Sequence, residues 1–367
     1  MNKYYFDYSA TTPVADKYLE VYNEISKKFY MNTQSDPITS DLAKQAQNKI
    51  LELLNLNNNY EVIFTSGGTE ANSLAILGRF KNEVNKKHFI TSAIEHPSVL
   101  ETFYELQRLG HEVEFINPQS NGIIKEEEVV NKVKKNTALI SIMSVNNEIG
   151  TIQPINKIFT AVKKINTNII TMSDFVQAVG KIKIDFTNVD LGTFSGHKFY
   201  GAKGIGILIK KKKIVMEQII YGSKISIRPG TQSLADQIAF VNVLQKAIET
   251  TEVNYKEIIK KQEYFINKLN KDKIKINGEQ SIGVLNITLD IMAQSETVVE
   301  YLYDKGIIIS TKSSCAVKLN KPSHVLQSVG LDDKQINRTI RISFSVKTTI
   351  EEIDYLIKEL NIVVNKF

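Results

Sequence analysis

The run ALISIMSV at residues 138–145 is apolar on both faces of an extended chain. Strands with this pattern are buried on both sides, as in a parallel sheet that helices cover on each face. Further short apolar runs occur in the first half of the chain, at residues 61–65, 89–93, 112–116 and 169–173. Amphipathic stretches of helical period alternate with these runs, at residues 41–56, 98–109 and 125–135. This alternation predicts the α/β fold class, with a mainly parallel sheet flanked by helices.

The order of the predicted elements changes in the last third of the chain. A long helical pattern at residues 232–270 is followed by predicted strands at 273–277, 284–290, 307–310 and 339–344 and predicted helices at 295–305 and 350–364. We interpret this part as a smaller α+β domain. We therefore expect a large cofactor-binding α/β domain at residues 15–255 and a small α+β domain that combines residues 1–14 with residues 256–367.

The composition is that of a globular protein, since 42% of the 367 residues are hydrophobic and 23% are charged. The chain has one cysteine, Cys315, which excludes an intrachain disulfide and a cysteine-rich zinc site, and we expect no metal. The net charge of +6 is spread along the chain, so we expect no direct binding of nucleic acid. No apolar stretch approaches the roughly 18–20 residues that span a membrane, and the chain starts without a secretory signal. These features predict a cytoplasmic protein that does not contact membranes.

Polar residues follow the predicted strands at their carboxyl ends, the edge where α/β sheets bind ligands. The run at 61–65 leads into Gly67, Gly68 and Thr69 at the start of a helix, where free N–H groups favour an anion such as phosphate. An ordinary glycine-rich turn explains this segment equally well. His96 follows the next strand, and a single histidine is more often a structural residue than a functional one.

Three later strands also end in polar side chains, which are Asn147, then Asp174 and Gln177, and then Ser195, His197 and Lys198. The charge of Asp174 is costly at the end of an apolar strand unless a cation pairs with it. An anion site, a partly buried aspartate, a histidine and a lysine together suit pyridoxal phosphate. The lysine holds the cofactor aldehyde as a Schiff base, and the aspartate keeps the pyridine nitrogen protonated so that the ring withdraws electrons.

The chain resembles the cysteine desulfurases, which belong to the class V aminotransferase group of fold type I pyridoxal-phosphate enzymes. The resemblance rests on motifs that occur in order along nearly the whole chain, at residues 6–13, 66–72, 95–99, 145–150, 174–177, 195–198 and 341–345. It implies that pyridoxal 5'-phosphate is the cofactor and that the enzyme is a homodimer.

The resemblance implies a role in cofactor binding for ten residues: Gly68, Thr69, His96, Asn147, Asp174, Gln177, Ser195, His197, Lys198 and Thr231. The phosphate ligands among them are Thr69, Ser195 and His197. Thr231 reaches the cofactor from the second subunit. Arg341 binds the substrate carboxylate together with Asn147, because a guanidinium group makes strong and directional contacts with a carboxylate.

The implied catalytic residues are Lys198, Cys315 and His96. In this interpretation Lys198 holds the cofactor and moves protons, while Asp174 pairs with the pyridine nitrogen. His96 stacks on the cofactor ring, and Gln177 lies with Asn147 at its phenolic oxygen.

Cys315 lies where the family carries its nucleophile, in a loop typical of the longer-loop subgroup that serves iron–sulfur cluster assembly and thiolation. Without this context, a lone cysteine is best interpreted as a packed core residue. The neighbouring Lys312 and Lys318 favour the thiolate. The resemblance implies conversion of L-cysteine to L-alanine with transfer of the sulfur to Cys315 as a persulfide. The sulfur then passes to an acceptor protein, either an iron–sulfur scaffold or a thiolation enzyme for tRNA or cofactors.

Residues 30–37, residues 221–225 and Lys312 depart from the family pattern, and we expect them to affect activity and partner choice. One alternative hypothesis is a class V aminotransferase or lyase that acts on another amino acid, but Cys315 in the matching loop argues against it. A second is a poorly active regulatory paralogue, which the retention of Lys198 and Asp174 argues against. A third is a nucleic-acid binder, for which the modest positive charge is the sole support.

Overall fold

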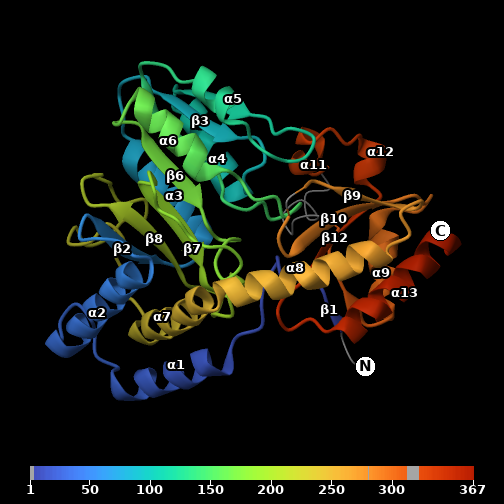
Figure 1. Cartoon of the computed structure of the whole chain (residues 1–367). Coiled ribbons are helices and arrows are strands. Elements are labelled where there is room, and N and C mark those ends of the chain that lie inside the picture. The colour runs from blue at the N-terminus through green and yellow to red at the C-terminus, as the bar shows by residue number, and fades with distance from the viewer. Residues whose placement is uncertain (1–3, 280, 312–321) are drawn as a thin grey trace.

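The computed structural model describes residues 4–279, 281–311 and 322–367. Within these ranges, seven strands form one sheet in the order β2-β8-β7-β6-β5-β3-β4 (Figure 1). Their bounds are β2 Tyr60–Thr65, β3 His88–Ser92, β4 Glu112–Ile116, β5 Thr137–Ser141, β6 Ile170–Asp174, β7 Leu191–Ser195 and β8 Gly206–Lys211. Strand β8 runs antiparallel to both of its neighbours, and the other neighbouring pairs are parallel. The predicted α/β fold with a mainly parallel sheet is confirmed.

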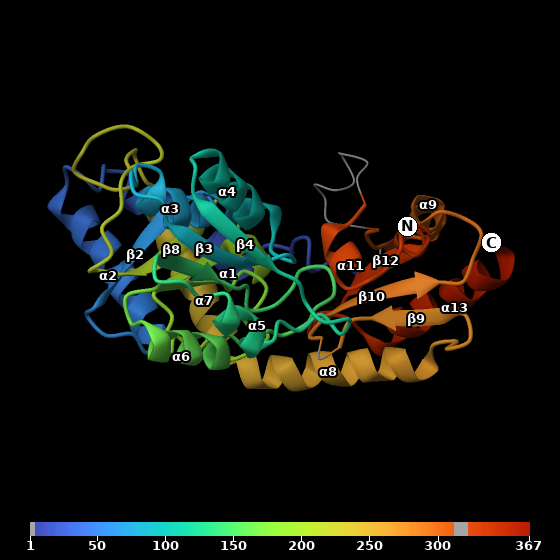
Figure 2. The same cartoon turned by 90° about the horizontal axis from the view of Figure 1, so that it is seen from above.

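Helices cover both faces of this sheet (Figure 2). One face carries α3 Gly68–Phe80 and α4 Pro97–Arg108, and the other carries α6 Ile155–Ile165 and α7 Leu234–Glu249. The remaining helices of this part are α1 Asp16–Lys28 and α2 Pro37–Leu53, which pack on α7, and α5 Glu126–Asn131, which packs on α6. Successive side chains of β5 point to opposite faces, so that Leu139 packs with α3 and α4 while Ile140 joins the hydrophobic cluster on the other face.

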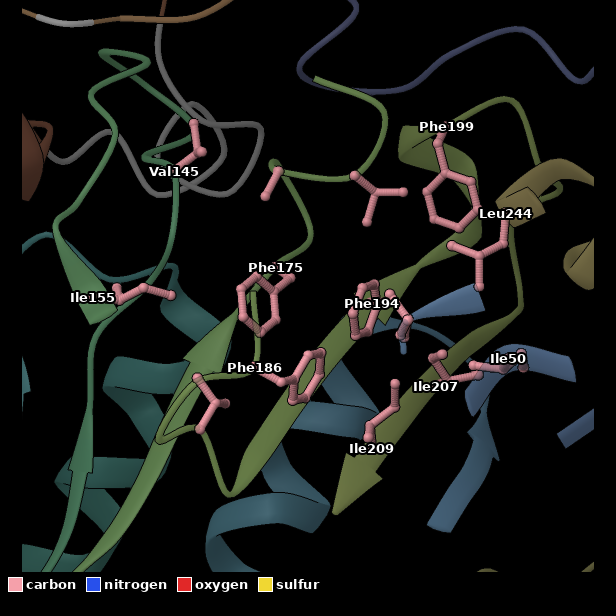
Figure 3. Close-up of a cluster of buried hydrophobic side chains, with 14 of the residues drawn as sticks. Ile50, Val145, Ile155, Phe175, Phe186, Phe194, Phe199, Ile207, Ile209 and Leu244 are labelled. Carbon is pink, nitrogen blue, oxygen red and sulfur yellow. The ribbon is translucent and has the colours of Figure 1, made fainter. Parts of the chain in front are cut away.

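Three phenylalanine rings pack together near the carboxyl ends of β6 and β7 (Figure 3). Phe175 follows β6, Phe194 lies in β7, and Phe186 lies in the connection between these strands. The ring centroid of Phe175 is 5.2 Å from that of Phe186 and 5.5 Å from that of Phe194. Since Phe194 directly precedes Ser195, this packing fixes the strand end that carries the predicted cofactor lysine.

A second sheet lies at the other end of the molecule (Figure 2). Three strands of the described chain form it in the antiparallel order β12-β10-β9, with bounds β9 Ile274–Asn277, β10 Val284–Leu289 and β12 Thr339–Ser343. Its apolar side packs in one cluster with α8 Thr251–Lys268, α9 Ser295–Asp304 and α13 Ile350–Lys366. None of the helices placed in the described ranges has the length and apolar character needed to cross a membrane.

The start of the chain lies against this second sheet (Figure 1). Strand β1 Tyr4–Tyr5 pairs in parallel with β11 Ile307–Ile308, and Phe6 is fully buried in the cluster of the second sheet. Two short helices, α11 His324–Ser328 and α12 Asp333–Ile336, complete this part. The division of the chain into a large domain at residues 15–255 and a small domain of residues 1–14 and 256–367 stays a prediction.

Several predicted elements differ from the structure at their ends. The regular strand β5 ends at Ser141, although residues 142–145 remain buried and the N–H groups of Ile142 and Ser144 still donate to carbonyl oxygens of β6. The pattern at 125–135 is helical within α5 alone, and the pattern at 232–270 forms two helices, α7 and α8, that meet at Thr250. A buried irregular segment has the same apolar pattern as a buried strand, so the sequence does not show where β5 ends.

We predict that Phe194→Ala lowers the free energy of unfolding by about 3–5 kcal/mol, because it leaves a cavity among rings that are buried. Denaturant titration followed by circular dichroism measures this change. Val84→Ala is the control, since the Val84 side chain is 93% exposed and its truncation is expected to change stability by less than about 0.5 kcal/mol. Equal losses for the two variants would contradict the prediction.

Candidate active site

A pocket of about 290 Å³ lies at the carboxyl ends of β5, β6 and β7. Ten of the twelve residues predicted from the sequence line it: Gly68, Thr69, His96, Asn147, Asp174, Gln177, Ser195, His197, Lys198 and Arg341. Thr231 does not, because it lines a separate cavity of about 210 Å³ beside Ser66 and Arg228. Cys315 lies outside the described residues. The structure therefore brings most of the predicted residues together, and their individual roles remain predictions.

Lys198 ends a short 3-10 turn, η1 Gly196–Lys198, that directly follows β7. Its Nζ donates hydrogen bonds to the carbonyl oxygens of Ser9 at 2.7 Å and Ala10 at 2.8 Å. Burial, together with the positive charge of Arg341, lowers the pKa of the Lys198 amine to about 8. An amine with this pKa is partly neutral in mildly alkaline solution, as a nucleophile or a base must be.

Asp174 is the last residue of β6, and its side chain is buried. Oδ2 accepts a hydrogen bond from Nδ2 of Asn72, and Oδ1 accepts one from the backbone N–H of Val176, both at 2.8 Å. Thr193 in turn donates to Oδ1 of Asn72 at 2.6 Å, which fixes the orientation of that amide. Burial raises the pKa of Asp174 in spite of these bonds. The carboxylate is therefore oriented by two donors, and a further N–H group or cation in the pocket would stabilise its charged form.

His96 is the N-cap of α4, where its Nδ1 accepts a hydrogen bond from the backbone N–H of Ser98 at 3.1 Å. Pro97 takes the first helical position, as the sequence predicts. Burial and the charge of Lys198 lower the pKa of His96 to about 4, so the imidazole is neutral near pH 7. A neutral ring held by its cap bond is suited to stacking on an aromatic ligand.

Gly68 and Thr69 begin α3, a 13-residue helix whose first N–H groups lie at the pocket. Glu70 follows them in the first turn, where a free carboxylate opposes an anion. Its charge is compensated, because Arg228 Nε donates to Oε1 at 2.8 Å and the Ser66 backbone N–H donates to Oε2 at 2.6 Å. The helix N-terminus is thus available for a phosphate group.

Arg341 lies in β12, and 3% of its side chain is exposed. Nη2 forms an ion pair with Oδ1 of Asp7 at 2.9 Å, and Nη1 donates to the carbonyl oxygen of Asn147 at 3.1 Å. Nε has no hydrogen-bond partner among the described residues. The guanidinium group is therefore held in place at the pocket, and the second N–H groups of Nη1 and Nη2 remain for a ligand carboxylate.

Sequence reasoning missed several polar residues around the pocket. Asn72 orients Asp174, Asp7 pairs with Arg341, and Lys181 donates to Oε1 of Gln177 at 2.8 Å. Asn72 and Asp7 lie inside motifs that carried the family resemblance, so their positions were available as a signal. For Lys181 the sequence offers only a spacing of four residues from Gln177, and this spacing does not show that the side chain is buried.

These residues fit pyridoxal phosphate. The buried carboxylate of Asp174 suits a protonated pyridine nitrogen, the N-terminus of α3 suits the phosphate, and the Lys198 amine suits the aldehyde. The pocket volume is close to the lower end of the range of small-ligand sites, which is about 300–1,000 Å³. The fold and the pocket define the class of pyridoxal-phosphate enzymes built on an α/β sheet.

Comparisons with known proteins agree with this class. The family model described as Aminotransferase class-V matches residues 4–356. A relative from Dictyoglomus turgidum named "Cysteine desulfurase IscS" is 32% identical, and the alignment covers 99% of this chain and 94% of the relative. The chain belongs to the class-V aminotransferase family, whose cofactor is pyridoxal phosphate.

Solved structures are similar over the same length. A protein described as "NIFS-LIKE PROTEIN" has a TM-score of 0.91 at 30% identity, with all of both chains covered. A structure described as "SspA in complex with cysteine" has a TM-score of 0.80 at 31% identity, and the alignment covers 95% of this chain and all of the other.

We predict that replacing Glu95, which directly precedes His96, alters how stability depends on pH. Ser92 and the Met143 backbone donate to Oε1 of Glu95, while burial raises the pKa of its carboxyl from 4.5 to about 8. Between pH 5 and pH 8 the unfolded chain therefore releases this proton more readily than the folded chain. The contribution of the neutral carboxyl to stability is lost as pH rises through this window.

In Glu95→Gln the side chain is neutral at every pH, so the variant is expected to gain stability relative to wild type by more than about 1 kcal/mol from pH 5 to pH 8. Urea denaturation at several pH values measures the difference. Glu101→Gln, at an exposed position of α4, is the control and is expected to run parallel to wild type. A parallel curve for Glu95→Gln would show that the buried carboxyl does not bind a proton in this range.

Proposed function

We propose that this chain is a cysteine desulfurase that converts L-cysteine to L-alanine and retains the sulfur on Cys315 as a persulfide. The observation that carries the proposal is the shared pocket of Lys198, Asp174 and Arg341, since it combines a cofactor site with a carboxylate-binding cation. The relatives named cysteine desulfurase and the similar structure described as a complex with cysteine support cysteine as the substrate.

The substrate is oriented through its carboxylate. Arg341 is held by Asp7 and by the carbonyl of Asn147, and its Nη1 and Nη2 atoms each carry a second N–H group that can donate to a carboxylate oxygen. A guanidinium group that is already fixed loses little side-chain entropy when the ligand binds. This placement turns the amino group and Cα of the amino acid toward Lys198, which lines the same pocket.

Lys198 is the residue that moves protons. Its Nζ has a lowered pKa and lies 2.7 Å from the Ser9 carbonyl oxygen, so the free amine accepts the proton of the substrate Cα and returns it later. When bound, pyridoxal phosphate supplies an electron-withdrawing ring that stabilises the negative charge at that carbon. Asp174 holds a proton at the pyridine nitrogen of the cofactor, and the neutral His96 ring covers one face of the site.

The proposed sulfur transfer uses Cys315. Its thiolate attacks the sulfur of the bound cysteine, and the new S–S bond forms as the C–S bond of the substrate breaks. The electron pair of that bond stays on the carbon, which takes up a proton and becomes the methyl group of alanine. Cysteine and one thiol thus yield alanine and one persulfide, with no additional oxidant.

The outer sulfur of the Cys315 persulfide has to pass to an acceptor outside the chain, because the sequence contains no second cysteine to receive it. We therefore propose that the sulfur is transferred to an external acceptor, either an iron–sulfur scaffold or a thiolation enzyme. We also propose a cytoplasmic location. The longer-loop motif around Cys315 supports an acceptor of this kind. We expect the atypical segments 30–37 and 221–225 to influence its choice. Several side chains in and near these segments are exposed and apolar, including Tyr30, Tyr221 and Ile225.

We further propose a homodimer in which Thr231 completes the cofactor site of the second subunit. Two observations support it. Thr231 is exposed and lines a cavity separate from the pocket of its own chain, and the nearby Ile225 side chain is 96% exposed. An apolar side chain with this exposure gains from burial against a second copy.

Cys315→Ser is expected to reduce formation of alanine and sulfide from L-cysteine at least a hundredfold, because serine does not accept sulfur as a persulfide. Cofactor binding is expected to stay unchanged. Alanine is measured by chromatography, and the bound cofactor by its visible absorption. Lys198→Ala is the matched comparison and should lose the covalent cofactor bond that borohydride fixes. A Cys315→Ser enzyme with wild-type turnover would contradict the assignment of the nucleophile.

The sharing of Thr231 predicts complementation between two inactive variants. In a mixed dimer of Lys198→Ala and Thr231→Ala subunits, one of the two sites combines an intact Lys198 with an intact Thr231 from its partner. About half of the activity per dimer is therefore expected to return when the two variants are co-expressed and the heterodimer is purified with two tags. If each Thr231 serves its own chain, the mixed dimer has no intact site and stays inactive.

A further inference from the structure

Lys181 lies behind the cofactor pocket, beyond Gln177. Its Nζ donates a hydrogen bond to Oε1 of Gln177 at 2.8 Å, and 8% of the residue is exposed. No carboxylate of the described chain lies within ion-pair distance of it. Lys181 is therefore a buried lysine whose hydrogen-bond partner is a neutral amide, an arrangement that is costly and calls for an explanation.

The surroundings of Lys181 do not offset this cost. The lysine stem lines a mostly apolar cavity of about 280 Å³, which Phe199 and Phe344 also line. Burial, together with the positive charges of Lys198 and Arg341, lowers the pKa of Lys181 to about 7. An apolar side chain of similar length would fill this position without the cost of burying an amine.

The hydrogen bonds of Gln177 show what the lysine achieves. Nε2 of Gln177 donates to the carbonyl oxygen of Ser9 at 2.8 Å, and the same carbonyl accepts a bond from Nζ of Lys198. Because Oε1 accepts from Lys181 and Nε2 donates to Ser9, the positions of the amide oxygen and nitrogen are both determined. The flipped amide would place its oxygen against the Ser9 oxygen, which is repulsive, and would lose the hydrogen bond that Lys181 donates to Oε1.

We infer that Lys181 is a positioning residue that holds Gln177 with its amide N–H group toward the cofactor pocket, as a donor to the phenolic oxygen of the bound cofactor. The inference rests on the cofactor-binding part of the proposed function. Gln177 lines the pocket, whereas Lys181 lines the cavity behind it and acts through the amide. A donor at this place favours the ionised form of the phenolic oxygen, because an N–H group stabilises an anionic acceptor more than a neutral hydroxyl.

The contact also explains why the position carries a lysine. When Lys181 is replaced by an apolar residue, Oε1 of Gln177 becomes a buried acceptor without a donor. The amide then turns toward any available donor, and the pocket loses an N–H group of fixed direction.

The test is a double-mutant cycle on the full-length protein. It compares wild type with Lys181→Met, Gln177→Ala and the double variant. Pyridoxal phosphate is titrated into each apo-protein, and its dissociation constant and absorption bands are recorded. Lys181→Met is expected to weaken cofactor binding about tenfold and to change the ratio of the absorption bands. In the Gln177→Ala background the same substitution is expected to change neither quantity, because the residue through which it acts is gone.

Two further measurements separate positioning from a structural role. Lys181→Met removes the cost of burying an amine but leaves Oε1 of Gln177 without a donor, so the two effects offset each other and the variant is expected to unfold at nearly the same denaturant concentration as wild type. Lys181→Arg retains a donor and is expected to return the absorption bands toward those of wild type. A structural role predicts the reverse, with lower stability in Lys181→Met and effects that add in the double variant.

Additive effects, or an unchanged spectrum and affinity in Lys181→Met, would overturn the inference while leaving the proposed function intact. A wild-type protein that binds no pyridoxal phosphate would overturn both.

Discussion

The ion pair between Asp7 and Arg341 holds the first segment of the described chain against β12, and the pocket depends on the place of this segment. Arg341 belongs to β12 of the second sheet, while Asp7 begins the segment whose next residues, Ser9 and Ala10, accept hydrogen bonds from Lys198 of the first sheet. Replacing either partner of a buried ion pair leaves the other charge uncompensated, so such a substitution is strongly destabilising. The same carboxylate accepts a bond from Ser310 at 2.8 Å, close to the segment that contains Cys315.

The pocket collects positive charge, and this explains its chemistry. Burial lowers the pKa values of Lys198 and Lys181, and the charge of Arg341 lowers both further, whereas Asp7 and Asp174 act in the opposite direction on Lys198. Such an excess of cationic groups attracts an anionic cofactor and an anionic substrate carboxylate. It also keeps an amine partly neutral near physiological pH, which a lysine in water does not achieve.

The sequence predicted the sheet and the pocket because both leave local signals. Apolar runs that end in Asp174 or in Lys198 show a strand and a polar residue at its exit, and strand exits in an α/β sheet meet at one edge. The end of β5 at Ser141 was not predictable, since the residues after it are equally apolar and buried. Lys181 was missed because its burial depends on packing between segments that are distant in sequence. The proposed role of Thr231 depends on a second chain, and Cys315 lies outside the described residues.

The pairing of the chain's first strand with β11 has a consequence for biosynthesis. Tyr4 and Tyr5 are translated about 300 residues before their partners Ile307 and Ile308. Strand β2 likewise pairs with β8, which is translated about 140 residues later. The segment that carries the carbonyls of Ser9 and Ala10 is held by β11 and β12, so it gains these partners only after both strands are translated. The part of the pocket that this segment forms is therefore completed after the strands of the first sheet have been synthesised.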